Sequence, residues 1–199
     1  MLRLIHRIVS NPWIYDLSQV IAGRRTTRRA LAACLPTARR DQFVLDLGGG
    51  TGAYRMLWPE DGQFICLDLE MPKLHGFRAR YPADHALLAD GTRLPLPDHC
   101  MDVVQMIFVA HHLTDPQLDA ALEESRRVLK PDGHLVLMDP LWVPRRLRGR
   151  LLWALDRGSY PRTDDALRAH IALHFNISFV YALSIHHAYG IYIGVPRGE

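Results

Sequence analysis

The feature that most constrains this chain is residues 44–54, VLDLGGGTGAY, where four glycines fall within five positions directly after an apolar run. The run FVLDL (43–47) predicts a strand, and TGAYRMLW (51–58) predicts the start of a helix. Glycines at a strand-to-helix turn let the backbone approach a ligand closely, and the start of a helix offers unpaired N–H donors. The stretch therefore predicts a binding loop at one edge of a sheet.

Three classes of ligand use such a loop, and the spacing separates them. A phosphate-binding P-loop requires Gly-Lys-Ser/Thr, which this segment lacks. A dinucleotide loop requires G-x-G-x-x-G/A, and Gly48, Gly50 and Ala53 satisfy its looser form. The third pattern places an acid before three alternate glycines, as do Asp46, Gly48, Gly50 and Gly52. A pyrophosphate needs no such acid, whereas a ligand with an ammonium and a sulfonium is attracted to it by ~1–4 kcal/mol at ~4 Å.

Apolar runs that alternate with helical segments predict the fold class. Further strands are expected at 63–69, 85–90, 101–108 and 134–139. Helices are expected up to about Tyr81 and over 115–129 with Asp115 as N-cap, and 130–133 is expected to be a turn. The runs 175–185 and 187–195 predict an antiparallel hairpin, because almost nothing connects them. The chain is thus expected to be an α/β protein: a Rossmann-like doubly wound, mostly parallel seven-stranded sheet with an antiparallel C-terminal hairpin strand.

Three of the predicted strands end in aspartate. Asp46 precedes the glycines, Asp68 ends the second strand and Asp90 ends the third. A carboxylate at the position of Asp68 can accept hydrogen bonds from ribose hydroxyls, and one at Asp90 can accept an adenine amino group. Each alone reads equally well as a turn or capping residue. Together they fall on the sheet edge where such folds bind ligands, which favours a site there.

With these segments the chain resembles the class I S-adenosylmethionine-dependent methyltransferases, of the small methyltransferase-11 type. The matching segments are VLDLGGGTG (44–52), CLDLE (66–70), 87–113 and RVLKPDGHLVLMDP (127–140). The resemblance implies S-adenosylmethionine as cofactor, with its methionine moiety at Asp46 and the glycines. It also implies ribose at Asp68, adenine at Asp90–Gly91 and the sulfonium near 106–112. The implied cofactor-binding set is Asp46, Gly48, Gly49, Gly50, Gly52, Asp68, Leu69, Asp90, Gly91 and Met106. Gly49 stands where the family often has Cys or Ala, a departure expected to be harmless.

Methyl transfer from a sulfonium needs mainly alignment and a desolvated pocket, with a base only if the acceptor loses a proton. The candidate catalytic residues are His111, His112 and Asp139, which follow strand-like runs, with His186–His187 as a further pair. The alternatives are packing and hydrogen bonding for His111 and His112, a loop cap for Asp139 and a hairpin turn for His186–His187. No metal site is expected.

The whole chain, 1–199, is expected to be a single methyltransferase domain: an N-terminal helical cap (1–40), a cofactor-binding core (41–140), and an acceptor-side segment with the terminal hairpin (141–199). The segment 142–158, WVPRRLRGRLLWALDRG, is basic and amphipathic. It can roof a pocket for a lipid-like or anionic acceptor, make a peripheral membrane contact, or be an ordinary surface helix.

Charge and cysteine usage bound the partners. The formal charge is +7 over 1–40, −8 over 41–140 and +5 over 141–162. Such a layout fits solvated helix faces or attraction to an anionic substrate or membrane surface. No nucleic-acid motif is present, so nucleic acid is not an expected partner. The three cysteines are odd in number and far apart, which indicates reduced thiols and a cytoplasmic location. High Arg and low Lys usage suggests a bacterial source.

The expected function is S-adenosylmethionine-dependent methylation of a small molecule on O, N or C, with a hydrophobic, aromatic or lipid-like acceptor. Two other functions stay open. One is a non-catalytic S-adenosylmethionine-binding subunit that supports a partner. The other is a nicotinamide-dependent oxidoreductase, against which Asp46 and the antiparallel hairpin argue.

Overall fold

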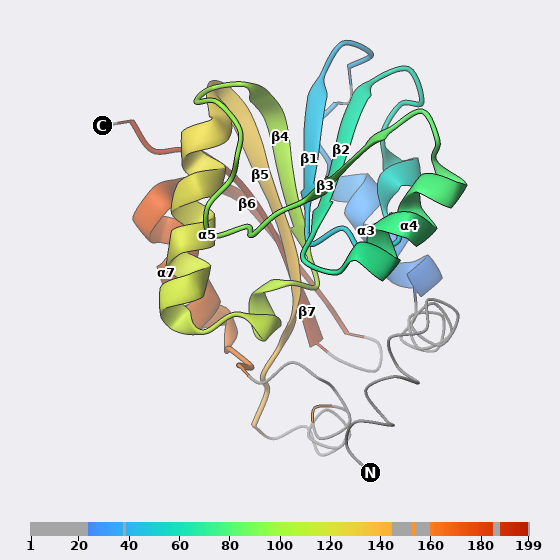
Figure 1. Ribbon diagram of the computed structural model, residues 1–199. Helices are drawn as coiled ribbons and strands as arrows, with labels where there is room; N and C mark the ends of the chain where they lie inside the picture. Colours follow the sequence, from blue (N-terminus) through green and yellow to red (C-terminus); the bar gives the residue numbers. More distant parts are fainter. Residues whose placement is uncertain (1–23, 38, 145–152, 154–159, 185–187, 199) are drawn as a thin grey trace.

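The computed structural model describes residues 24–37, 39–144, 153, 160–184 and 188–198 (Figure 1). These residues form a seven-stranded sheet with strand order β3-β2-β1-β4-β5-β7-β6. The strands are β1 (Phe43–Leu47), β2 (Gln63–Asp68), β3 (His85–Leu88), β4 (Met101–Ile107), β5 (Leu129–Leu141), β6 (Phe175–Ser184) and β7 (Ala188–Pro196). The helices predicted before residue 24, most of 142–158, and His186–His187 lie outside the described residues.

The strand directions confirm the predicted sheet. The first five strands pair in parallel, and β7 pairs antiparallel with both β5 and β6. All seven residues of β4 are buried, as expected for the centre of a sheet covered on both faces. The carboxyl ends of β1 to β4 therefore meet at one edge, which is the lower edge of the sheet in Figure 1.

Helices cover both faces of the sheet (Figure 1). On one face lie α5 (Asp115–Val128) and α7 (Asp164–His174), and on the other lie α3 (Arg24–Cys34) and α4 (Met71–Arg80). A hydrophobic core beneath α5 and α7 includes Leu118 and Ile171. A second core, beneath α3 and α4, includes Leu31 and Phe77. The alternation of side chains along each strand supplies both cores at once.

The predicted helix over 51–58 is wrong. Its hydrogen bonds join residues three apart, from Gly52 N to the Gly49 carbonyl and from Trp58 N to the Arg55 carbonyl, and they end in the short 3-10 helix η1 (Arg55–Leu57). The buried guanidinium of Arg55 donates to the carbonyls of Trp58 and Pro59, at 3.0 Å each. These contacts fold the chain back directly after η1, so no α-helix propagates.

The predicted N-cap of α5 is also wrong by one residue. The Oγ1 of Thr114 accepts a hydrogen bond from the Gln117 backbone N–H, and the Gln117 side chain accepts one from the Thr114 backbone N–H. This capping box satisfies two donors at once, and Asp115 lies in the first turn, where a negative charge favours the helix dipole.

Two further segments differ from the expectation. The turn at 130–133 lies inside β5, where the pairing with β4 jumps from Met101–Leu129 to Val103–His134 and leaves four residues to bulge out. The helix α7 was not predicted, although Thr163 is a regular N-cap whose Oγ1 accepts the Ala166 N–H.

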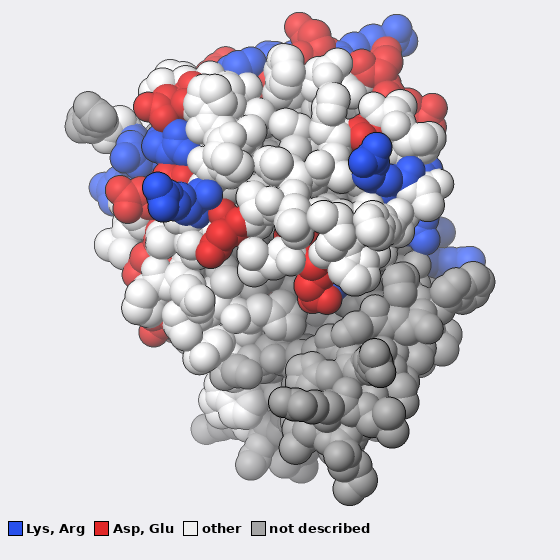
Figure 2. All heavy atoms as spheres, in the orientation of Figure 1, with Lys and Arg blue, Asp and Glu red and all other residues white. Residues whose placement is uncertain are grey.

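The described residues on the face in Figure 2 form no large field of one charge sign. Acidic and basic side chains alternate along its sides and top, while its middle is mostly uncharged. None of the helices in the described ranges has the length and apolar character needed to cross a bilayer.

Candidate functional site

The glycine loop connects β1 to η1 and lies against the end of β2. The backbone N–H groups of Gly48 and Gly49 both donate to the Leu67 carbonyl, at 2.8 and 3.0 Å. The three alternate glycines of the motif have positive φ angles: 72° at Gly48, 58° at Gly50 and 74° at Gly52. This backbone conformation is costly for residues with a Cβ, which explains why the glycines alternate.

Close packing adds a second reason for two of these glycines. A Cβ on Gly48 would lie 2.5 Å from Val109 Cγ2, and one on Gly52 would lie 2.5 Å from the Phe77 ring. Gly49 has no positive φ, but a Cβ there would lie 2.4 Å from Oδ2 of Asp46. The departure from Cys or Ala at position 49 therefore leaves room for this carboxylate beside the loop.

Asp46 is a buried acid beneath the loop, with only 2% of its surface exposed. Its Oδ2 has no hydrogen-bond partner among the described residues. Burial raises the pKa of Asp46 to about 7, while the amide of Gln105 opposes the shift and the charge of Asp68 adds to it. Gln105 faces Asp46 from the adjacent strand β4 and is itself fixed by Trp58, whose Nε1 donates to Oε1 at 2.7 Å.

Asp68, at the end of β2, holds the other side of the loop. Its Oδ2 accepts the Gly50 N–H at 3.0 Å, and its Oδ1 accepts the Glu70 N–H at 2.9 Å. Burial raises the pKa of Asp68, although Lys73 and these two N–H groups act against it. The carboxylate thus anchors the loop backbone, and its remaining lone pairs lie at the edge where ribose binding was expected.

The other predicted cofactor residues differ in exposure. Asp90 is exposed, and its Oδ1 accepts hydrogen bonds from both the backbone N–H and the hydroxyl of Thr92. Leu69, directly after β2, is 67% exposed, so its side chain is accessible to the ring of a ligand. Gly91 packs so closely on Leu47 that a Cβ would lie 2.8 Å away, and Met106 is fully buried in the core behind the loop.

The helix α3 closes the back of the loop. The guanidinium of Arg28 donates to the Ala53 carbonyl through Nη2 at 2.6 Å and through Nε at 3.0 Å. The hydroxyls of Thr27 and Tyr54 lie 3.2 Å apart. The C-terminal part of the segment 1–40 thus contacts the residues that directly follow the glycine loop.

The predicted catalytic residues come together at the ends of β4 and β5. The Nδ1 of His111 lies 2.9 Å from Oδ1 of Asp139, and both residues are buried, with 4% and 3% of their surface exposed. The pairing of Ile107 with Met138 across these strands brings the two residues into reach. The His112 ring lies beside that of His111, with centroids 4.0 Å apart.

An aromatic cluster adjoins this pair. The ring of Trp153 meets that of His111 edge-on at 5.7 Å, and the rings of Trp142 and Trp153 are 6.5 Å apart. The ring of Phe108, a residue with a φ of 60°, contacts those of Tyr54 and Tyr189. Such a conformation is strained for a bulky residue, and it turns the chain from β4 toward η2 (Ala110–His112).

Comparison with known proteins identifies the domain. Residues 45–137 match the family model described as a methyltransferase domain. Residues 45–137 therefore belong to the class I S-adenosylmethionine-dependent methyltransferases. This confirms the resemblance found in the sequence, and S-adenosylmethionine is the cofactor of this family of enzymes.

The individual proteins that this chain resembles in sequence are also methyltransferases. A demethylmenaquinone methyltransferase of Streptomyces griseus is 32% identical over 139 residues, which cover 66% of this chain and 59% of that protein. A malonyl-[acyl-carrier protein] O-methyltransferase of Serratia marcescens is 41% identical over 91 residues, covering 45% of this chain and 35% of that protein. The chain thus spans less than two thirds of the length of these curated relatives.

Solved structures share the fold. A methyltransferase in complex with the Haloferax volcanii Trm112 activator superposes with a TM-score of 0.80 at 17% identity, covering 96% of this chain and 97% of that chain. At this identity the similarity shows the fold alone.

The residues of the methyltransferase domain fit the family's cofactor. S-adenosylmethionine carries an ammonium and a sulfonium, both of which favour a nearby carboxylate. The buried Oδ2 of Asp46, without a partner among the described residues, is a group that such a cation would satisfy. The exposed Leu69 and the acid Asp68 stand at the adjoining strand end.

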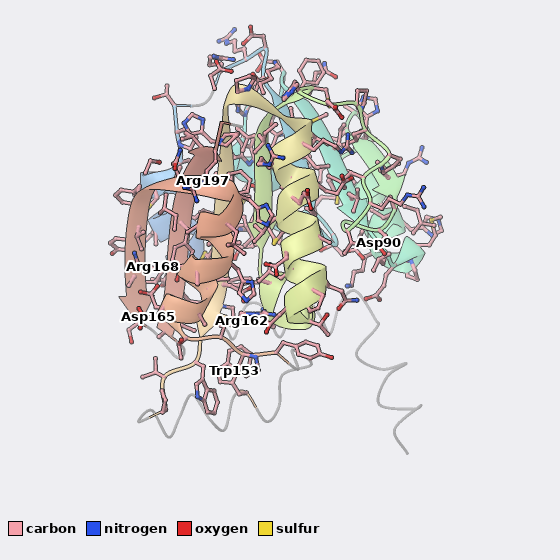
Figure 3. The ribbon with its side chains drawn as sticks, turned by 90° about the vertical axis from the view of Figure 1, so that its left-hand side faces the viewer. Asp90, Trp153, Arg162, Asp165, Arg168 and Arg197 are labelled. Carbon is pink, nitrogen blue, oxygen red and sulfur yellow. The ribbon has the colours of Figure 1, made fainter. Side chains whose placement is uncertain are left out.

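Several residues of the site were missed by sequence reasoning. Gln105 could have been found, because it is a lone amide inside an apolar strand. Arg28 and Arg162 could not, because surface and buried arginines look alike in a sequence. Arg162 is only 8% exposed and lies at the same end of the molecule as Trp153 (Figure 3).

Proposed function

We propose that this chain transfers the methyl group of S-adenosylmethionine to a small hydrophobic acceptor. The observation that carries the proposal is the buried Oδ2 of Asp46 beside a glycine loop that matches the methyltransferase domain. When bound, S-adenosylmethionine supplies a methyl group already activated on a sulfonium, so the protein needs to align the reactants and exclude water.

The proposal gives the loop residues distinct tasks. Asp46 and the backbone of Gly48, Gly49, Gly50 and Gly52 hold the methionine moiety, with the carboxylate of Asp46 facing its positive charges. Asp68 fixes the loop through Gly50 and binds ribose. Leu69 and Asp90–Gly91 flank the adenine, and Met106 supports the sulfonium side from the core. Asp90 is exposed and its carboxylate bonds to Thr92 of its own turn, which leaves it accessible to a ligand.

The acceptor side lies at the ends of β4 and β5, where His111, His112 and Asp139 meet the two tryptophans. Aromatic walls with a few polar groups suit a flat or apolar molecule. The relative from Streptomyces griseus is named for demethylmenaquinone, which is such a molecule, and the relative from Serratia marcescens for a malonyl thioester. We favour a ring-containing hydrophobic acceptor and keep the malonyl thioester as the alternative.

Two measurements test the proposal in order. Calorimetric titration with S-adenosylmethionine and S-adenosylhomocysteine, with NADH and NADPH as controls, is expected to show micromolar binding of the first pair alone. Transfer of a labelled methyl group is then measured to reduced demethylmenaquinone and to malonyl-acyl carrier protein. Binding of neither cofactor by the folded protein, or of the nicotinamides alone, overturns the proposal. Binding without transfer to any acceptor favours a supporting subunit.

A further inference from the structure

Arg162 clamps the turn that carries His111 and His112. Its Nη1 donates to the Ala110 carbonyl and its Nη2 to the Leu113 carbonyl, both at 2.8 Å. Ala110 is the first residue of η2, and Leu113 directly follows its last residue. The planar guanidinium, with five donors in a fixed geometry, can hold both ends of one turn at once.

The backbone around Arg162 is attached to the strand that carries Asp139. The Trp142 N–H donates to the Arg162 carbonyl at 2.7 Å, and Leu141 forms an isolated β-bridge with Arg162. Leu141 is the last residue of β5 and lies two positions after Asp139. The Tyr160 N–H, in turn, donates to the His111 carbonyl at 3.1 Å. The segment 160–162 therefore contacts both the turn that carries His111 and the end of the strand that carries Asp139.

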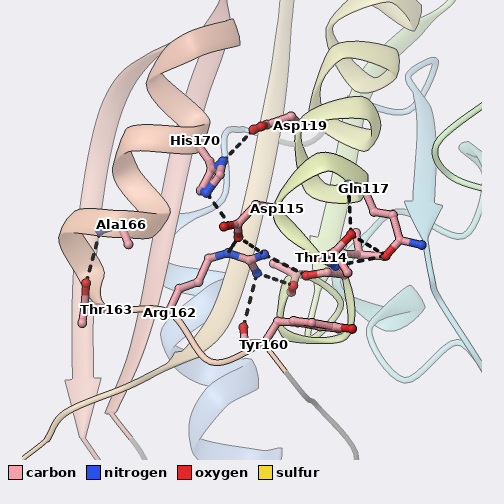
Figure 4. A network of polar contacts seen from close by, with 11 residues as sticks. Thr114, Asp115, Gln117, Asp119, Tyr160, Arg162, Thr163, Ala166 and His170 are labelled. Atoms are coloured by element: carbon pink, nitrogen blue, oxygen red, sulfur yellow. Dashed lines mark hydrogen bonds and ion pairs between the residues drawn. The ribbon is translucent and has the colours of Figure 1, made fainter.

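Charge compensation keeps Arg162 in this place (Figure 4). Its Nη2 and Nε donate to Oδ1 of Asp115 at 2.6 and 2.9 Å. His170 of α7 lies 3.5 Å from the same Asp115 oxygen and bonds to Asp119 at 2.6 Å. The hydrogen bond from Arg162 lowers the pKa of Asp115, so this acid remains ionised. The network thus ties α5 and α7 to the turn.

We propose that Arg162 is a positioning residue that holds His111 against Asp139, and that His111 accepts the proton that the acceptor loses in methyl transfer. This inference rests on the proposed function. With Nδ1 donating to Asp139, the neutral imidazole carries its lone pair on Nε2. The acceptor would give its proton to Nε2, and the electron pair left on the acceptor atom would form the bond to the methyl carbon. The S–CH3 bond would break at the same time and leave its electron pair on sulfur, so that S-adenosylhomocysteine is the second product. The imidazolium that forms is balanced by the buried Asp139 carboxylate. The acceptor is accordingly a protic group, such as a ring hydroxyl or an acidic C–H.

The test substitutes Arg162→Lys, which keeps the charge but cannot reach two carbonyls and a carboxylate together. The ring nitrogens of His111 are observed by NMR in isotope-labelled protein, with the resonance assigned through His111→Gln. The wild-type ring is expected to show a protonated Nδ1 protected from solvent exchange. In Arg162→Lys this protected signal is expected to be lost, while affinity for S-adenosylhomocysteine is unchanged because the glycine loop is not involved.

Two further variants control for general loosening. Arg168→Lys makes the same substitution on α7, where Arg168 pairs with Asp164 away from the turn, and is expected to leave the His111 signal intact (Figure 3). Asp115→Asn keeps the guanidinium and its carbonyl partners and is expected to give a smaller change in the direction of Arg162→Lys, so the inference can be tested even if that variant fails to fold. A His111 signal unchanged in both Arg162→Lys and Asp115→Asn, or lost equally in Arg168→Lys, overturns the inference.

The methyl-transfer assay separates failure of this inference from failure of the proposed function. Absence of cofactor binding in the wild type refutes the proposed function whatever the NMR result. With reduced demethylmenaquinone as probe, Arg162→Lys is expected to lower the rate at saturating cofactor without changing cofactor affinity. If the wild type is active on this probe and Arg162→Lys has the same rate, the result contradicts a role for Arg162 in proton transfer.

Discussion

Asp46→Asn should raise the stability of the protein in mild base and weaken cofactor binding at the same time. Burial raises the pKa of Asp46 from 3.8 to about 7, so the folded state holds a proton that the unfolded state has released. The unfolding free energy contributed by Asp46 therefore falls as the pH rises from about 4 to about 7, and is constant above. Between pH 5 and pH 7 this amounts to about 3 kcal/mol, at about 1.4 kcal/mol for each pH unit.

Asparagine is neutral at every pH, so the unfolding free energy of Asp46→Asn does not fall with pH through this position. Its amide hydrogens lack an evident acceptor in the site, which costs ~1–3 kcal/mol at any pH. We expect Asp46→Asn to be similar to or less stable than the wild type at pH 5 and more stable than the wild type at pH 8. The difference between the two proteins should change by about 3 kcal/mol over this range, measured by urea unfolding.

Asp102→Asn serves as the control. Burial acts to raise the pKa of Asp102, but the Phe43 N–H and the Lys130 ammonium outweigh it and lower the pKa. Asp102 thus stabilises the fold wherever it is ionised in both states, which includes pH 5 and pH 8 alike. Its replacement should destabilise the protein by a similar amount at both pH values.

Cofactor affinity should move in the opposite direction to stability. Loss of the Asp46 charge removes an attraction of ~1–4 kcal/mol toward the cofactor's positive groups, or about fivefold or more in Kd at pH 8. A stability difference between Asp46→Asn and wild type that is independent of pH would refute the protonated buried acid. An unchanged Kd would refute its contact with the cofactor.

Three smaller predictions follow from the same site and its surroundings. Asp68→Asn should weaken S-adenosylhomocysteine binding about tenfold or more, since a bond to a charged acceptor is worth ~1.5–3 kcal/mol; calorimetry with the 2′-deoxy analogue distinguishes a ribose contact, which affects only the parent ligand, from loosening of Gly50, which affects both. Gly48→Ala should cost at least ~1–2 kcal/mol, because of its positive φ and its approach to Val109, and an unchanged Tm would contradict this. Thr114→Ala should lose ~1 kcal/mol of stability through the broken capping box while cofactor affinity stays the same, as thermal unfolding and calorimetry can check.

Much of the fold was readable from local patterns. The apolar runs predicted all seven strands, six of them to within two residues, while β5 begins five residues before its predicted start. The signal is clearest for β4, because a strand buried on both faces must be apolar along its length. The same patterns failed after the glycine loop, where the helix expected over 51–58 gives way to η1. There Arg55 takes up the nearby carbonyls and bonds to the distant Asp84 at 3.0 Å, and no local periodicity encodes that contact.

The candidate site divides in the same way. The order of acid and glycines in residues 46–52 was sufficient to predict a loop for a cationic ligand, since φ and charge are properties of single residues. Which acid is buried without a partner, and which anchors the loop, depends on the neighbouring strands. Gln105 lies opposite Asp46, and the Gly50 N–H reaches Asp68, because β2, β1 and β4 are adjacent.

The sequence by itself therefore determined the layered sheet, the glycine loop and the set of polar residues at the strand ends, because each follows from periodicity or from the chemistry of one short segment. Only the tertiary structure decided that His111 bonds to Asp139 and that Arg162 holds their turn. His111 and Asp139 are 28 positions apart in the chain, and Arg162 lies 52 and 49 positions from Ala110 and Leu113, whose carbonyls it binds. Strand order and register bring them together, and those are fixed by the packing of the whole sheet rather than by any local pattern.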